Sequence, residues 1–204
     1  MKDTFKTIKI KSKESLFKDK NSKFYGVAYP VNSEEEVKSK LLEIKKKHPS
    51  AGHHCYAYQF GVKDIRYRAN DDGEPNNSAG LPIYGQIKSF GLTNILVVST
   101  RYFGGTKLGV SGLINAYRTS AKLTLETSDI VENFITVNFK MTFNYQEMSL
   151  VMKIIKEKNI EILNHKLEIQ CEYIISVREN QAEDIYNLFN KVFKIKISKL
   201  KTHF

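Results

Sequence analysis

The chain has 204 residues, of which 41% are hydrophobic and 11% aromatic, a composition that is typical of folded globular proteins and excludes a disordered chain. No apolar run approaches the roughly 18 residues of a membrane helix. The N-terminal residues lack the apolar core of a signal peptide, and Cys55 and Cys171 are too few for a disulfide framework, so we expect a cytoplasmic protein with no membrane partner. The formal net charge of +10 makes polyanions such as nucleic acid expected partners.

The first domain is predicted to span residues 1–130. Its strands and helices alternate irregularly, which favours an α+β sandwich over a doubly wound parallel sheet. The clearest helix begins after Ser33, because Ser33-Glu-Glu-Glu36 is a capping box in which Glu36 reaches back to the Ser33 amide, and Pro49 ends it. The other expected elements are strands at 5–11, 24–31, 55–60 and 94–99, a polar loop at 68–79, and helices at 79–90 and 110–125.

The second domain is predicted to span residues 131–204. The expected elements are strands at 134–143, 160–169, 171–178 and 194–200, and helices at 145–158 and 182–192. The order β-α-β-β-α-β is that of the ferredoxin-like fold. Its apolar residues at helical spacing are interpreted as core, and no catalytic constellation is visible in this part of the sequence.

A glycine-rich segment follows the strand at 94–99. Glycines allow positive φ and a close approach of backbone N–H groups to a ligand, and the following helix adds the positive end of its dipole. The segment is not a P-loop, because Leu108 follows its lysine where Ser or Thr is required. The residues expected to bind phosphate or nucleic acid are Arg101, Tyr102, Gly104, Gly105, Lys107, Gly109 and Gly112. The glycines could instead serve only a tight turn and close helix packing.

Two polar motifs could form a second part of this site, namely His53-His54 and a loop that carries Asp71, Asp72 and Glu74. Imidazoles and carboxylates can bind a metal ion, or they can form a hydrogen-bond network that fixes the loops. Adjacent residues of a strand point to opposite faces, which disfavours one shared ion, and we expect no metal. These carboxylates could also pair with Arg101 inside the fold, as an alternative to a phosphate clamp.

Several motifs together resemble those of the IMPACT family. They are Lys20-Asn-Ser-Lys-Phe24, His53-His-Cys55, Asn70-Asp-Asp-Gly-Glu-Pro75, Ser78-Ala-Gly-Leu-Pro82 and Arg101-Tyr-Phe-Gly-Gly-Thr-Lys-Leu-Gly109. The resemblance implies a first domain like the second domain of a small-subunit ribosomal protein and domain four of elongation factor G, and a second domain like domain five of that factor. Eukaryotic relatives act in translational control through an additional partner-binding domain that this sequence lacks, so their mechanism is not carried over. What the resemblance implies for this chain is a pair of folds associated with ribosomes and RNA.

The leading hypothesis is a non-enzymatic protein that binds RNA or the ribosome and acts in translation or its regulation. Residues 1–130 carry 21 Lys and Arg against 13 Asp and Glu, whereas the rest of the chain carries 11 against 9, although biased composition alone can also produce such an excess. The alternative is an enzyme or binding protein for a phosphorylated small molecule or nucleotide at Gly104–Gly112. A protein partner in translation control is the third possibility, and no cofactor is expected.

Overall fold

The computed structural model describes residues 3–200, and its contacts divide the chain into two compact units. One unit comprises Phe5–Asn133, and the other comprises residues 134–200 together with residues 3 and 4. Each unit has its own hydrophobic core. Within the described residues, no helix is both long enough and apolar enough to cross a membrane.

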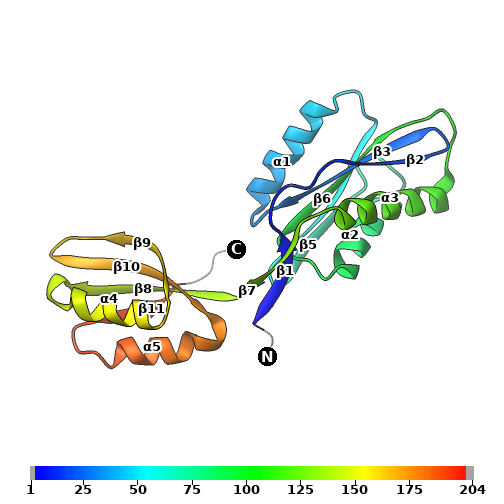
Figure 1. Cartoon of the computed structure of the whole chain (residues 1–204). Coiled ribbons are helices and arrows are strands. Elements are labelled where there is room, and N and C mark those ends of the chain that lie inside the picture. The colour runs from blue at the N-terminus through cyan, green and yellow to red at the C-terminus, as the bar shows by residue number, and fades with distance from the viewer. Residues whose placement is uncertain (1–2, 201–204) are drawn as a thin grey trace. The chain divides into compact units, whose positions relative to one another are not determined.

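The first unit is built on a five-stranded antiparallel sheet in the order β2-β3-β6-β4-β5 (Figure 1). Its strands are β2 (Ser15–Asp19), β3 (Ser22–Pro30), β4 (His53–Phe60), β5 (Arg66–Asn70) and β6 (Ile95–Tyr102). Its helices are α1 (Glu34–Lys47), α2 (Gly80–Ser89) and α3 (Gly109–Glu126). A separate two-stranded sheet pairs β1 (Thr4–Ile8) with β7 (Ile130–Phe134).

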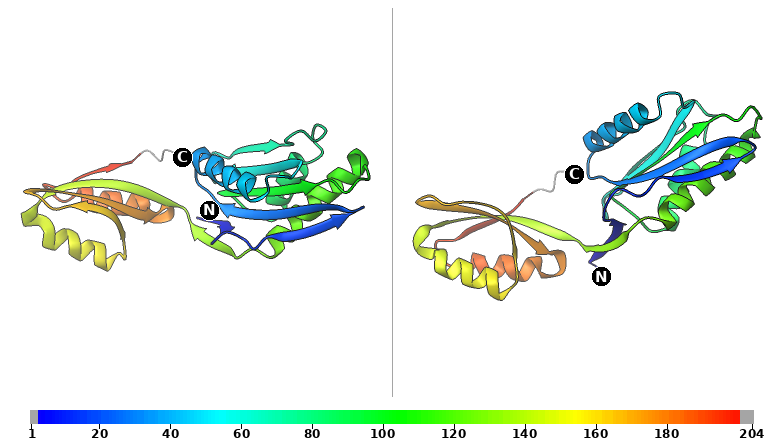
Figure 2. Two further views of the ribbon diagram at one scale, coloured as in Figure 1. Left: turned by 90° about the horizontal axis from the view of Figure 1, so that it is seen from above. Right: turned by 45° about the horizontal axis from the view of Figure 1, so that its top comes forward.

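The five-stranded sheet lies between α1 on one face and α2 with α3 on the other (Figures 1 and 2). Side chains of a strand alternate between the two faces, so in the central strand β6 Ile95 and Val97 pack on the α2 and α3 side, whereas Leu96 and Val98 pack on the α1 side. This sandwich confirms the predicted α+β class.

The N-terminus of α1 shows the expected capping interaction at Ser33. The Ser33 hydroxyl oxygen accepts a hydrogen bond from the Glu36 N–H at 3.2 Å. The Glu36 carboxylate accepts from the Asn32 N–H at 2.9 Å rather than from the Ser33 amide, so the reciprocal bond is displaced by one residue. It still satisfies a backbone donor beside the helix start.

Three strands lie where the sequence pattern predicts none, namely β2, β5 and β7. β2 and β5 are the edges of the five-stranded sheet. Edge strands carry polar and charged side chains that discourage pairing with other chains, so they lack the apolar alternation of a half-buried strand. Most side chains of β5 and β7 are exposed, and the predicted loop at 68–79 therefore begins only after β5.

The second unit has a four-stranded antiparallel sheet in the order β11-β8-β10-β9. Its elements are β8 (Thr136–Asn144), α4 (Met148–Glu157), β9 (Glu161–Lys166), β10 (Gln170–Arg178), α5 (Ala182–Asn190) and β11 (Lys196–Lys199), with the short 3-10 turns η1 (Tyr145–Glu147) and η2 (Glu179–Gln181) before the two helices. Both helices pack on one face of the sheet and share one core with it (Figures 1 and 2). This arrangement agrees with the predicted β-α-β-β-α-β order.

Candidate functional site

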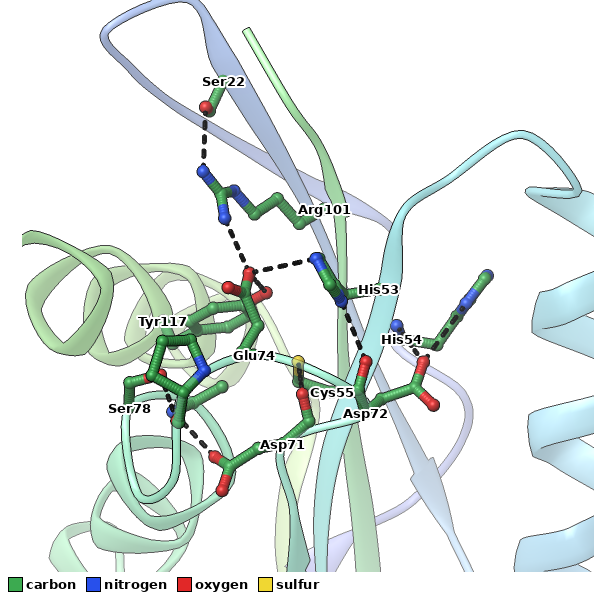
Figure 3. Close-up of polar contacts among 12 residues, drawn as sticks. Ser22, His53, His54, Cys55, Asp71, Asp72, Glu74, Ser78, Arg101 and Tyr117 are labelled. Atoms are coloured by element: carbon green, nitrogen blue, oxygen red, sulfur yellow. Dashed lines mark hydrogen bonds and ion pairs between the residues drawn. The ribbon is translucent and has the colours of Figure 1, made fainter. Parts of the chain in front are cut away.

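The polar motifs of the first unit meet at one end of its sheet (Figure 3). His53 in β4 and Arg101 in β6 are direct cross-strand partners, and the loop after β5 places its acidic residues against them. The residues connected there by hydrogen bonds or ion pairs are Ser22, His53, His54, Cys55, Asp71, Asp72, Glu74, Arg101 and Tyr117. The structure therefore brings together both polar motifs and the arginine of the glycine-rich segment.

Arg101 and Glu74 form a buried ion pair at the centre of this cluster. Arg101 Nη1 donates to Glu74 Oε1 at 2.7 Å, and only 7% and 4% of the two side chains are exposed. The Tyr117 hydroxyl of α3 donates to the same oxygen at 2.7 Å, and burial raises the pKa of Tyr117 well above its usual range. The sequence leaves open whether Arg101 clamps a phosphate or pairs with a carboxylate inside the fold. In the structure, Arg101 makes the internal pair with Glu74.

The Arg101 guanidinium has more donors than partners. Its Nη2 lies 3.5 Å from Ser22 Oγ, and its buried Nε has no hydrogen-bond partner among the described residues. A guanidinium carries five N–H donors, and leaving buried donors unpaired costs stability. The carboxylate of Glu74 supplies the counter-charge for this buried cation.

His53 and His54 point to opposite faces of β4 (Figure 3), as adjacent strand residues must. His53 Nδ1 lies 2.8 Å from the Asp72 carbonyl oxygen, so Nδ1 carries a proton, and His53 Nε2 lies 3.9 Å from Glu74 Oε1. His54 Nε2 lies 3.2 Å from the His48 carbonyl oxygen, and burial lowers the pKa of His54. The described His, Cys, Asp and Glu residues include no group arranged to hold a metal ion.

Asp71 holds its loop on the N-terminus of α2. Its Oδ1 accepts from the Ala79 and Gly80 N–H groups at 2.9 and 2.8 Å, and its Oδ2 accepts from the Asn77 N–H at 2.8 Å. These bonds satisfy donors that the first turn of a helix leaves unpaired. The Cys55 thiol donates to the Asp71 carbonyl oxygen, and burial raises the pKa of the thiol above its usual range, so Cys55 is a packed, neutral side chain.

The glycine-rich segment starts later than its sequence pattern predicts. β6 extends through Tyr102, so Arg101 and Tyr102 are strand residues whose side chains point to opposite faces of the sheet. Gly104 packs against the turn between β2 and β3: its N–H donates to Ser22 Oγ at 3.2 Å, and a Cβ at this position would overlap the backbone of Asn21 and Ser22. Close packing is thus the role that the structure shows for Gly104.

The remaining residues of this segment are more open to solvent. Gly105 and Gly109 have φ angles of +87° and +74°, values that glycine adopts without strain. Lys107 is exposed, and Gly112 lies in the first turn of α3. The segment therefore offers one exposed cation and accessible backbone, whereas its arginine is turned inward.

A hollow of about 430 Å³ lies on the α1 side of the sheet, beside this loop. Its lining residues are Asn21, Lys23, Tyr25, His48, Tyr102 and Phe103, and we call it the basic–aromatic groove. Tyr25 and Tyr102 meet edge to face, with ring centroids 5.7 Å apart at 81°. His48 closes the group, because its Nδ1 lies 3.0 Å from the Tyr102 hydroxyl and its Nε2 lies 3.1 Å from Glu14 Oε2.

The sequence predicts a binding role only for Tyr102 among the residues of this groove, although Asn21, Lys23 and Phe103 also lie in the motifs that resemble the IMPACT family. Lys23 and Tyr25 alternate with the buried Phe24 in β3, and such alternation indicates that both point to the same face. Their proximity to Tyr102 follows from the register, in which Lys23 is opposite Tyr102. No sequence signal reports that register, so the groove is found only in the fold.

Exposed lysines gather next to the groove. Lys18 of β2 lies directly opposite Lys23 of β3, and like charges in such a pair destabilise a sheet. Lys20 lies in the turn between the same strands, and Lys107 lies in the loop that packs on this turn through Gly104. Two segments distant in sequence thus contribute positive charge to one region of the surface.

Comparison with known proteins identifies the family. The sequence profile of the Impact N-terminal domain matches residues 20–125. The IMPACT family member YvyE of Bacillus subtilis is 30% identical over 184 residues, which cover 89% of this chain and 84% of that protein. The chain belongs to the IMPACT family. The resemblance derived from its motifs is therefore confirmed.

Other comparisons extend this assignment along the chain. An IMPACT family member of Haemophilus influenzae is 30% identical over 80% of this chain and 81% of its own length. The crystal structure of a hypothetical protein aligns over the whole of both chains with a TM-score of 0.73 at 19% identity, which shows a shared fold. Within the IMPACT family match, residues 20–125 include both the Arg101–Glu74 cluster and the basic–aromatic groove.

Proposed function

We propose that this IMPACT family member is a non-enzymatic protein that binds RNA or the ribosome and acts in translation or its regulation. The observation that carries the proposal is the gathering of lysines from the β2–β3 hairpin and the β6–α3 loop beside an aromatic groove. Lysines supply contacts to phosphates, and aromatic rings supply contacts to bases. Family membership and the positive charge of residues 1–130 support the same function.

The roles of the predicted site residues differ within this proposal. Lys107 contacts phosphate, together with the accessible backbone N–H groups of Gly105 and Gly109. Tyr102 contributes its ring to the groove. Arg101 acts indirectly, because its guanidinium is held by Glu74. The residues of the His53-His54 and Asp71–Glu74 motifs keep the same end of the sheet in place.

The test is binding of the full chain to ribosomes and to a mixed RNA pool across a salt series. The variant carries Lys23→Glu and Lys107→Glu, and the matched control carries Lys156→Glu and Lys191→Glu, two exposed lysines of the second unit. We expect weaker binding and a shallower salt dependence for the first variant only, since each phosphate contact contributes about 0.7 to 0.9 to the slope. Equal binding by both variants would reject these lysines as contacts, and no binding by the natural chain at low salt would reject the function.

The alternative is binding or turnover of a phosphorylated small molecule or nucleotide at Gly104–Gly112. A thermal-shift series with ATP, GTP and Mg²⁺ separates the two, because a ligand that binds only the folded chain raises its melting temperature saturably. Saturable stabilisation that Lys107→Glu removes would favour the alternative. A flat response together with salt-sensitive RNA binding supports the proposal.

A further inference from the structure

The basic–aromatic groove combines features that a purely structural hollow does not need. The Phe103 ring is 57% exposed at its rim, although burial of a large aromatic ring is worth a few kcal/mol. The Arg101 guanidinium carbon lies 5.5 Å from the centroid of this ring, so a buried cation anchors the ring while much of it stays in solvent. An exposed aromatic ring in a fixed position is a surface on which another flat group can stack.

Charge reinforces this geometry. The groove residues include one lysine, Lys23, and none of them carries a carboxylate. Across the three strands β2, β3 and β6, the register aligns Lys18, Lys23 and Tyr102 in one row on the same face. The row places Lys23 directly beside Tyr102, and Lys18 lies one strand further from that ring. A ligand that complements it must therefore carry negative charge beside a planar aromatic group.

We propose that the groove binds an unpaired base of single-stranded RNA, which stacks on Phe103 and on the Tyr25–Tyr102 pair while Lys18 and Lys23 contact the adjacent phosphates. This inference rests on the proposed function and names its substrate class. A volume of about 430 Å³ lies within the roughly 300–1,000 Å³ of small-molecule sites. The Asn21 amide at the rim offers a donor and an acceptor to the edge of a base.

Double-stranded RNA does not satisfy the same site. In an A-form duplex the bases are stacked on one another and their edges lie in the grooves, so a protein contacts mainly phosphates and 2′-hydroxyls. A duplex would reach the lysines and leave the rings of Tyr102 and Phe103 without a partner. Stacking on aromatic side chains therefore discriminates single strands from duplexes, and this discrimination can be measured.

Fluorescence offers a direct test, because the chain contains no tryptophan. The variant Phe103→Trp places a single indole at the rim of the groove, and Phe193→Trp is the matched control at another exposed phenylalanine, 85% exposed, in the second unit. The titrant is a single-stranded RNA of about 12 nucleotides, within the site sizes of stacking platforms. We expect saturable quenching for Phe103→Trp and no saturable change for Phe193→Trp.

Affinity provides the second measurement. Phe103→Ala is expected to weaken binding of the single strand about tenfold, within the range of base–aromatic stacking, and to leave binding of a duplex of the same sequence unchanged. Phe193→Ala is expected to change neither affinity. Phe103 is more than half exposed, so its truncation leaves the fold intact, which circular dichroism verifies.

The outcomes separate this inference from the function on which it rests. If the natural chain binds RNA or ribosomes but Phe103→Trp is not quenched and Phe103→Ala binds normally, the base does not enter the groove, and the proposed function stands without it. If single-stranded and duplex RNA lose affinity equally in Phe103→Ala, stacking is excluded as well. If the natural chain binds neither RNA nor ribosomes, both proposals are overturned.

Discussion

Arg101 and Glu74 are two charged residues that come from separate motifs and are buried against each other at 2.7 Å. Taking two charges out of water costs several kcal/mol, and their attraction offsets this cost only when the geometry is good and the remaining polar atoms are bonded. Tyr117 also donates to Glu74 Oε1, whereas Arg101 Nε has no hydrogen-bond partner among the described residues. Loss of the Glu74 charge would therefore leave a buried guanidinium without its counter-charge, which is energetically costly.

Substitution of Glu74 by glutamine is expected to destabilise the protein by about 3–5 kcal/mol, because it leaves a buried guanidinium without its counter-charge. The measurement is the urea midpoint followed by circular dichroism. Glu43→Gln is the control, since the Glu43–Lys11 pair is nearly half exposed and such pairs contribute about 0–1 kcal/mol. Removal of both charges in Glu74→Leu with Arg101→Leu should cost less than Glu74→Gln alone. Equal losses for Glu74→Gln and Glu43→Gln would contradict this account.

His54 gives the first unit a dependence on pH. Burial lowers the pKa of its imidazole in the folded protein, so the unfolded chain binds a proton more readily. His54 costs no stability above the unfolded pKa of about 6.5 and destabilises the fold increasingly as the pH falls toward the folded pKa. His54→Gln keeps a donor for the His48 carbonyl but does not titrate, so it should lose less stability between pH 7.5 and pH 5 than the natural chain. Parallel curves in urea denaturation would refute a contribution from His54.

The contact between the β2–β3 turn and the β6–α3 loop requires glycine at position 104, because a side chain there would collide with the turn. Lys20 and Asn21 both have positive φ angles, +42° and +63°, as a two-residue hairpin turn of type I′ requires. Gly104 lies directly on the backbone of this turn. The position of Phe103, and with it the rim of the groove, is therefore set by a glycine one residue further along the chain.

Gly104→Ala should push the loop away from the turn and destabilise the protein by about 1–3 kcal/mol, the usual cost of overpacking. Gly85→Ala in α2 is the matched control, because its Cβ would meet no atom within 4 Å, and it should stabilise the helix by about 0.5–1 kcal/mol. Opposite signs in the shift of the urea midpoint support the packing role of Gly104. A neutral effect of Gly104→Ala would rule it out.

At the scale of elements, the sequence predicts those helices and strands whose own residues carry the signal, such as a helix cap or an apolar run. The helix α1 is recognisable because a Ser33 cap, apolar spacing and Pro49 all agree, and β6 is recognisable because both of its faces are apolar. β5 is not, because an exposed edge strand carries no hydrophobic period. The end of β6 was also unpredictable, since Arg101 and Tyr102 are polar residues that only cross-strand pairing keeps extended.

The candidate site shows the same limit. Motifs identify His53, Glu74 and Arg101 as unusual residues, yet sequence alone leaves open whether the arginine faces a ligand or a carboxylate. The answer depends on how the loop from Asp71 to Ala79 packs against β6, and this packing is a tertiary contact that no local sequence pattern encodes. The basic–aromatic groove depends on strand register in the same way, because Lys23 and Tyr102 are neighbours only through pairing of β3 with β6.

For the whole molecule, the cooperativity of unfolding depends on its separate hydrophobic cores. The two clusters of the first unit lie on the two faces of one sheet, and a third cluster lies in the second unit. A chain with separate cores is not expected to unfold in one all-or-none transition, because each core supplies its own cooperativity. Unfolding of one unit then leaves the hydrogen bonds of the other in place.

Phe189→Ala tests this independence, because Phe189 is fully buried in the core of the second unit. The substitution is expected to destabilise that unit by about 3–5 kcal/mol through lost burial and a cavity. Hydrogen exchange should then accelerate in β10, whereas the amides of β6, the central strand of the first unit, keep their protection. Leu188→Ala, at a partly exposed position of the same helix, should change neither strand. Loss of protection in β6 together with β10 would mean that the two units unfold as one.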